Sequence, residues 1–117
     1  MTNPTYLKNI EAEKILQLSQ LTECREGQII SRTLAQNQFL SITVFAFAKG
    51  EELSAHSSAG DAILTILEGK AQIIINGITH HLTAGQTIVM PAQIPHAVTA
   101  EEDFKMFLIV VFPQNTL

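Results

Sequence analysis

Two histidines, His56 and His96, are the side chains of this sequence best placed to do chemistry. An imidazole ring can transfer a proton near neutral pH and can bind a divalent transition metal. His56 precedes the apolar run 62–67, and His96 follows Pro91 and Pro95. Each histidine therefore lies where a predicted strand enters the core, and the pair marks a candidate site.

A third histidine could complete this set. His80 and His81 are neighbours in a predicted strand, so their side chains must point to opposite faces. His80 shares its face with Ile78 and Leu82, so we expect it to point inward and His81 to point outward. Asp61 is a further candidate ligand, but it would reach inward only from an irregular loop end.

Two interpretations of the histidines remain open. His56, His96 and His80 could hold one divalent transition metal, namely iron, nickel, zinc or manganese, with open positions for substrate. Alternatively, the histidines are neutral, hydrogen-bonded polar groups in a metal-free pocket that binds a small molecule.

Short apolar runs between close turns supply the elements that would position these side chains. The run 62–67 is too short for a helix, lies between turn signals, and is predicted to be a strand buried on both faces. Asn76-Gly77 predicts a type I′ hairpin, because both turn positions need a positive φ. The pattern predicts an all-β, antiparallel sandwich or barrel. The other predicted strands are 29–34, 39–48, 71–75, 78–82, 87–90, 96–99 and 104–112.

The first 27 residues differ from the rest. Apolar residues between Ile10 and Leu21 fall roughly at helical spacing, which predicts either a short helix or an extended arm. We therefore expect an N-terminal arm over residues 1–27 and one β-domain over residues 28–117.

Composition limits the possible partners. Of the 117 residues 46% are hydrophobic and only 15% charged, and the strands 39–48 and 104–112 are apolar on both faces. One face of each strand needs a cover, which predicts a homodimer packed sheet to sheet. The net charge of −4 without a basic cluster argues against nucleic acid and anionic membranes as partners. The single cysteine, Cys24, fits a reducing compartment, and we expect a cytoplasmic protein.

The chain resembles the cupins, small double-sheet jelly-roll barrels, over residues 39–112. The first cupin motif runs glycine, five residues, His-x-His, a few residues, glutamate, six residues and a closing glycine. Gly50, His56 and Gly69 match it, while Ser58 and Ala62 occupy the second histidine and glutamate positions.

The second cupin motif is also matched in part. Gly85, Pro91 and His96 fit it, whereas Gln93 and Ala100 replace a glycine and an asparagine. In the family the motif histidines and glutamate bind a divalent metal, and of these only His56 and His96 are present here.

The resemblance implies a jelly-roll barrel, a homodimer and three possible functions. The first is a module whose histidine-containing pocket binds a small molecule. The second is a metal-dependent dioxygenase, isomerase or decarboxylase, and the third is a dimeric structural or sensor domain. Strand positions predict the lining of the pocket: Ser58, Phe45, Phe47, Ile66, Met90 and Phe107.

Overall fold

The computed structural model describes residues 4–114 of the chain. None of the helices within this range is long and apolar enough to cross a membrane. The described residues form one 3-10 helix and nine strands: η1 (Leu18–Leu21), β1 (Ile29–Gln36), β2 (Leu40–Phe47), β3 (Glu52–His56), β4 (Asp61–Glu68), β5 (Lys70–Ile75), β6 (Ile78–Thr83), β7 (Thr87–Met90), β8 (His96–Ala100) and β9 (Phe104–Val111).

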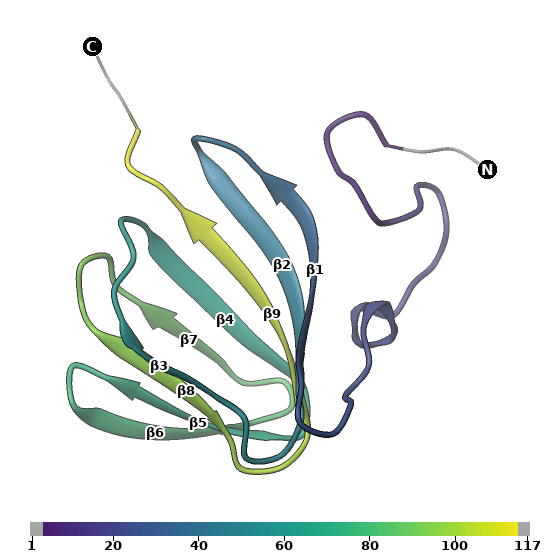
Figure 1. Cartoon of the computed structure of the whole chain (residues 1–117). Helices are drawn as coiled ribbons and strands as arrows, with labels where there is room; N and C mark the ends of the chain where they lie inside the picture. Colours follow the sequence, from purple (N-terminus) through teal and green to yellow (C-terminus); the bar gives the residue numbers. More distant parts are fainter. Residues whose placement is uncertain (1–3, 115–117) are drawn as a thin grey trace.

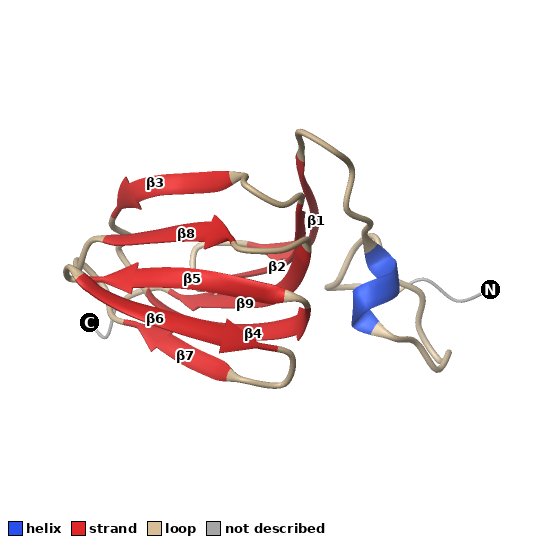
Figure 2. Ribbon diagram, turned by 90° about the horizontal axis from the view of Figure 1, so that it is seen from below, coloured by secondary structure: helices blue, strands red, loops and turns tan. Residues whose placement is uncertain are grey.

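The strands form two antiparallel sheets that face each other. Sheet A has the order β1-β2-β9-β4-β7, and sheet B has the order β3-β8-β5-β6. The two sheets approach each other at one end and diverge at the other, so the molecule is an open-ended sandwich (Figures 1 and 2). This arrangement confirms the predicted all-β double-sheet jelly roll.

The hairpin between β5 and β6 has the predicted turn. Asn76 has φ 50° and Gly77 has φ 80°, so both central residues adopt the positive φ that a type I′ turn requires. This turn pairs β5 with β6 in a continuous register from Lys70 opposite Thr83 to Ile75 opposite Ile78.

Two expectations about individual strands are wrong. Residues 52–56, which are absent from the predicted strands, form β3 at the edge of sheet B, where only Leu53 contributes a large apolar side chain. The strand β4 is not buried on both faces. Its residues Ala62, Leu64 and Ile66 are buried, but the side chain of Ile63 on the opposite face is 41% exposed.

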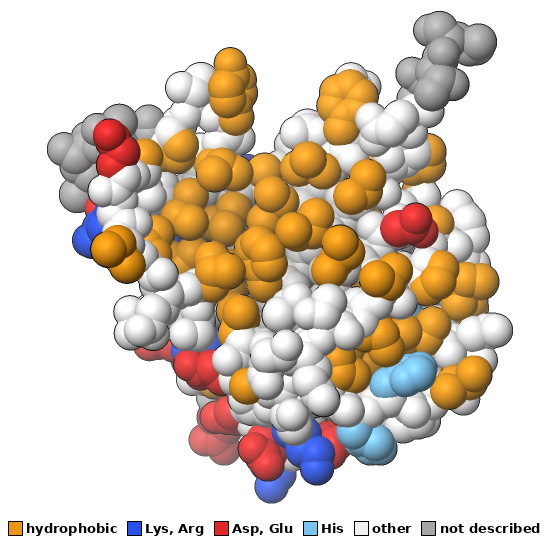
Figure 3. Space-filling model, turned by 180° about the vertical axis from the view of Figure 1, so that it is seen from behind, with side chains coloured by type: hydrophobic (Ala, Val, Ile, Leu, Met, Phe, Trp, Pro, Cys, Tyr) orange, Lys and Arg blue, Asp and Glu red, His pale blue; other side chains and the backbone are white. Residues whose placement is uncertain are grey.

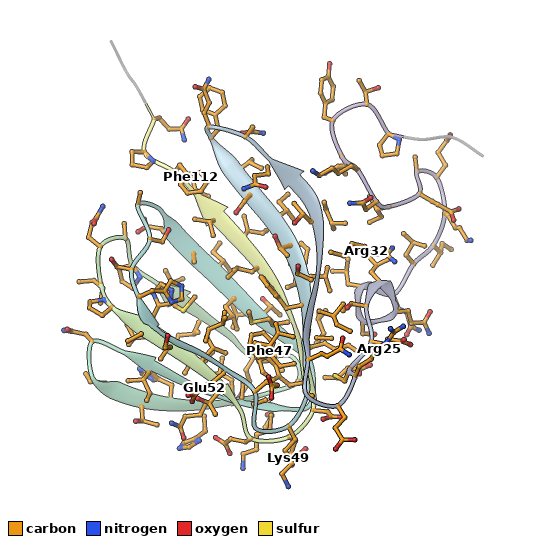
Figure 4. All side chains as sticks on the ribbon, viewed as in Figure 1. Arg25, Arg32, Phe47, Lys49, Glu52 and Phe112 are labelled. Atoms are coloured by element: carbon orange, nitrogen blue, oxygen red, sulfur yellow. The ribbon has the colours of Figure 1, made fainter. Side chains whose placement is uncertain are left out.

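The core lies between the sheets and is densest where they approach each other. Phe47 of β2 stacks on Phe104 of β9 with ring centroids 4.7 Å apart, and both side chains are fully buried. Figure 4 shows Phe47 at this end of the sandwich and Phe112 at the diverging end. The other fully or nearly fully buried core residues include Leu64, Ile66, Ile73, Val98 and Met106.

The N-terminal residues form an extended arm with one 3-10 turn, which decides between the two predicted forms. The arm lies beside β1 and is fixed by hydrogen bonds from the Lys8 amide to the Leu34 carbonyl (2.8 Å) and from the Asn9 side chain to the Thr33 carbonyl (2.8 Å). The first strand begins at Ile29, one residue after the predicted domain start. Residues 1–3 and 115–117, the outer ends of the predicted arm and domain, lie outside the described residues.

Candidate functional site

His56 and His96 lie directly opposite each other on neighbouring strands. His56 ends β3, His96 begins β8, and the two are cross-strand partners. Their rings meet edge to face, with centroids 4.4 Å apart and planes at 63°. His96 also pairs with Ile75, whose side chain packs against the core, so the histidine pair faces the space between the sheets.

The hydrogen bonds of both rings determine which nitrogen carries the proton. Nδ1 of His56 is 2.9 Å from the carbonyl oxygen of Ser54, and Nδ1 of His96 is 3.3 Å from that of Ile94. A carbonyl oxygen can only accept, so Nδ1 must be the donor in each ring. In the neutral form each Nε2 then has a free lone pair that can accept a hydrogen bond.

The two histidines differ in burial. The side chain of His56 is exposed, whereas His96 is only 6% exposed. Burial lowers the pKa of His96 below its ordinary value, and the nearby His56 ring lowers the pKa further, against the opposing effect of the Ile94 carbonyl. His96 is therefore neutral at pH 7 and acts as a hydrogen-bond partner rather than as a cation.

This lowered pKa predicts a pH dependence of stability. The unfolded chain binds a proton at His96 more readily than the folded chain, so stability is greatest above about pH 6.5 and is lost as the pH falls through the folded pKa. Urea denaturation of wild type and His96→Gln at pH 7.5 and pH 5.5 checks this. We expect a smaller decrease in the free energy of unfolding for the variant, and equal decreases would contradict the assignment.

Two loops next to the histidines are bound to each other. The Gln93 amide donates to the Ser58 carbonyl (2.8 Å), and the Gly60 amide donates to Ser58 Oγ (3.1 Å). Asp61 begins β4, is exposed, and its Oδ1 accepts a hydrogen bond from the Ala92 amide (2.8 Å). Ser58 and Asp61 therefore hold these loops together, and Asp61 points away from the histidines.

Gln93 adopts a left-handed backbone conformation with φ 65°, at the position where the motif has glycine. A non-glycine residue in this conformation costs roughly 1–2 kcal/mol of folding free energy. Glycine would remove this cost, but part of the gain would be lost because glycine gives the unfolded chain more conformational entropy. We expect Gln93→Gly to stabilise the protein by about 0.5–1 kcal/mol. The control Gln93→Ala removes the side chain without relieving φ, so a gain of stability in both variants would contradict this explanation.

His80 faces the interior but does not join the pair. It pairs with the fully buried Ile73, so its side chain lies on the inner face of sheet B, as predicted. However, β5 separates its strand from β8, which carries His96. His81 faces outward, as expected, where it contacts Glu101.

The donor set does not fit a resident metal with three protein ligands. Residues 4–114 contain no group of three or more His, Cys, Asp or Glu side chains that could hold a metal ion. His56 and His96 alone provide two imidazole ligands, and protein metal sites generally need three or four. The predicted set with His80 is therefore not assembled.

The predicted lining residues fall into three groups. Phe45 faces inward and is half-buried, so it lines the space between the sheets. Phe47, Ile66 and Met90 are at most 3% exposed and fill the core. Phe107 pairs with Val44 and Thr65, and the register places it on the outer face of sheet A, so it cannot line a pocket between the sheets.

Two hydroxyl residues that we did not predict face the interior. Ser41 pairs with Val110 and Thr43 pairs with Leu108, and both partners pack within the core. The signal was present in the sequence, because Ser41, Thr43 and Phe45 alternate along one face of β2. The inner face of this strand therefore offers hydroxyl groups beside an aromatic ring.

Cys24 has no role at the histidine pair. It is half-buried beneath sheet A, with Sγ 3.5 Å from the Phe47 carbonyl and 3.6 Å from the Phe104 carbonyl. Burial raises the pKa of this thiol, and Asp103 raises it further. A protonated, packed thiol is a poor nucleophile, so Cys24 is structural.

Comparison with known proteins agrees with the fold. A search of curated proteins finds no match. A conserved protein of unknown function from Streptococcus pyogenes has a similar structure with 50% identity and a TM-score of 0.93, over 97% of this chain and all of that one. A cupin superfamily protein from Desulfitobacterium hafniense shares 35% identity and a TM-score of 0.89, over 93% of this chain and all of that one.

More distant structures share only the architecture. Salicylate 1,2-dioxygenase from Pseudoaminobacter salicylatoxidans is 20% identical, with a TM-score of 0.66 over 71% of this chain and 26% of the enzyme. The family model of the cupin domain matches residues 43–112, which include both histidines. The chain thus belongs to the cupin family.

Proposed function

We propose that this chain is a cupin that binds a small molecule between its two sheets, with His56 and His96 as the polar anchor. The observation that carries the proposal is the pair itself. Two inward imidazoles meet edge to face, and both have Nδ1 occupied by a backbone carbonyl. Both Nε2 atoms are therefore free to accept hydrogen bonds from a ligand.

The surroundings of the pair support a small, partly apolar ligand. The inward-facing side chains of Phe45, Leu108 and Phe112 pack against the core but are only partly buried, so they offer apolar surface to a ligand. The hydroxyls of Ser41 and Thr43 lie on the same inner face. Apolar walls with a few polar groups are typical of small-molecule sites.

The chemistry of the pair limits the ligand class. Neutral imidazoles with free Nε2 atoms accept hydrogen bonds, so the ligand should offer hydroxyl donors. Aromatic neighbours favour a flat ring. We therefore infer a small hydroxylated aromatic compound as the ligand, and phenol, catechol and hydroxybenzoates are suitable probes.

A thermal-shift and calorimetric titration with these probes tests the proposal. We expect saturable binding to wild type, and at least about tenfold weaker binding to His96→Gln because a buried hydrogen-bonding partner is changed. The control His81→Gln alters an outward histidine and should bind like wild type. No saturable binding by any probe, or equal binding by His96→Gln, would contradict the proposal.

Elemental analysis of the same protein, purified without chelator, separates this proposal from a metal-dependent enzyme. We expect iron, nickel, zinc and manganese well below one atom per chain, unchanged by His56→Ala. Near-stoichiometric metal that disappears in His56→Ala and His96→Ala would instead support the enzyme and would require a third ligand.

A further inference from the structure

The loop between β7 and β8 (residues 91–95) carries the acceptor that fixes the ring of His96. The Ile94 carbonyl oxygen is 3.3 Å from Nδ1 of His96, and no other group within residues 4–114 bonds to that nitrogen. A hydrogen bond of this length is already near its upper limit, so a loop shift of about 0.3 Å would abolish it. The position of the β7–β8 loop therefore decides where His96 carries its proton.

The residues of this loop do not by themselves favour its conformation. Pro91 and Pro95 have no amide hydrogen to donate, and Gln93 adopts an unfavourable positive φ of 65°. The hydrogen bond within the loop, from the Ile94 amide to the Pro91 carbonyl, is long at 3.4 Å. Strained backbone of this kind persists only where neighbouring structure holds it, so the loop depends on its contacts with other elements.

Two of these contacts join main-chain groups. The Asn76 amide in the β5–β6 turn donates to the Pro95 carbonyl (2.9 Å), and the Gln93 amide donates to the Ser58 carbonyl in the loop before β4 (2.8 Å). Because only backbone atoms take part, most residue types at these positions could supply the same bonds.

The third contact depends on a particular side chain, that of Asp61. Ala62 of β4 pairs with Met90 at the end of β7, so the antiparallel register places Asp61 beside Pro91. Its Oδ1 atom accepts a hydrogen bond from the next amide along the chain, that of Ala92 (2.8 Å). A hydrogen bond to a carboxylate is roughly twice as strong as one between neutral groups. Apart from His96 itself, Asp61 is the only side chain in the described part of the protein that bonds to this loop.

The Asp61 carboxylate has no other bonding partner in the fold. The outer face of sheet A around it is apolar, because Ile63, Val89 and Val111 are exposed there. Figure 3 shows hydrophobic side chains gathered in one broad area beside the N-terminal arm, with most Lys and Arg side chains toward the lower edge. Within residues 4–114 no Lys, Arg or His side chain forms an ion pair with Asp61. The Ala92 amide is therefore the group that this carboxylate serves.

We propose that Asp61 is a positioning residue of the histidine site. Its bond to the Ala92 amide fixes the Ile94 carbonyl, which keeps the proton of His96 on Nδ1 and the free lone pair on Nε2. Without this bond the loop would relax from the strained φ at Gln93, and the Ile94 carbonyl would move out of range. His96 would then also carry its proton on Nε2 and present a donor where the ligand needs an acceptor. The consequence for binding rests on the proposed function, whereas the effect on the ring requires no ligand.

Nitrogen-15 NMR of the histidine rings in the ligand-free, full-length chain at pH 7.5 tests the positioning. In wild type the two ring nitrogens of His96 should give widely separated signals, as a single tautomer does. In Asp61→Ala these signals should move toward each other, because both tautomers become populated. Asp61→Asn keeps an acceptor oxygen and should retain the wild-type signals. An unchanged ring in Asp61→Ala, or an equal change in Asp61→Asn, would overturn the proposal.

Asp103→Ala is the matched control for a general loss of stability. Asp103 Oδ1 accepts a hydrogen bond from the Lys49 amide (2.7 Å), so this variant also removes a carboxylate that holds a loop amide. Figure 4 shows Lys49 at the end of the sandwich where the sheets approach each other, away from the diverging end. The His96 signals should be unchanged in Asp103→Ala. A change as large as that in Asp61→Ala would overturn the specific role of Asp61.

Calorimetric titration of the same variants with catechol measures the consequence for binding. We expect about three- to tenfold weaker binding to Asp61→Ala, and binding like wild type for Asp61→Asn and Asp103→Ala. Equal binding by Asp61→Ala and wild type would overturn the link between positioning and binding. A wild type that binds no catechol would contradict the proposed function, and the ring signals, which need no ligand, would still decide the role of Asp61.

Discussion

Gly69→Ala is expected to destabilise the protein by roughly 3–5 kcal/mol, because it combines backbone strain with a backbone clash. Gly69 has φ 80°, and a Cβ atom there would lie 2.0 Å from the Asp103 carbonyl oxygen and 2.8 Å from the Phe104 Cα atom. Neither atom belongs to a flexible side chain, so the corner between β8 and β9 would have to move. Urea denaturation of wild type and variant measures the loss.

Gly85→Ala is the matched control for this prediction. Gly85 has a similar φ of 89°, but no atom lies within 4 Å of the Cβ position. The control should therefore lose only the roughly 1–2 kcal/mol of conformational strain. If Gly69→Ala were no more destabilising than Gly85→Ala, the turn at Gly69 and the corner between β8 and β9 would not approach each other closely in solution.

Phe47→Ala is expected to cost about 3–5 kcal/mol of unfolding free energy. The Phe47 ring is completely buried and stacks on Phe104 where the sheets approach each other. Its removal leaves a cavity that strands from both sides cannot close without breaking their ladders. The midpoint of urea denaturation, with an unchanged slope, measures this loss.

Phe45→Ala distinguishes core packing from loss of aromatic area in general. Phe45 lies two residues earlier on the same face of β2, but its side chain is only half-buried. Its removal should cost clearly less stability than that of Phe47 and should instead weaken binding of the aromatic probes. Equal losses of stability would contradict the assignment of Phe47 to the core and of Phe45 to the ligand site.

The sequence predicted most strands because their apolar runs are bounded by glycine and proline turns. The hairpin at Asn76-Gly77 was predictable in conformation, since few other pairs tolerate two positive φ values. The strand β3 was not predictable, because an edge strand needs few apolar residues. Leu53 is the one large apolar residue in the β3 sequence ELSAH. Its pairing with β8 depends on the whole fold rather than on local preference.

The sequence indicates candidate residues for a site but not their geometry. The motif spacing indicated His56 and His96, yet only the pairing of β3 with β8 places the two rings in contact. Phe107 was assigned to the wrong face because β9 is apolar on both faces, and a shift of one residue reverses every side chain. Apolar side chains occupy both faces of β9, so the sequence pattern does not distinguish the inner face from the outer one.

Nitrogen-15 NMR of the histidine rings at pH 7.5, during titration with catechol, tests whether the histidine pair anchors the ligand. We expect that His56 and His96 both carry the proton on Nδ1, and that both Nε2 signals shift on binding while His81 is unaffected. Rings protonated on Nε2, or Nε2 signals that do not respond while catechol binds, would contradict the histidine pair as the anchor of the ligand site.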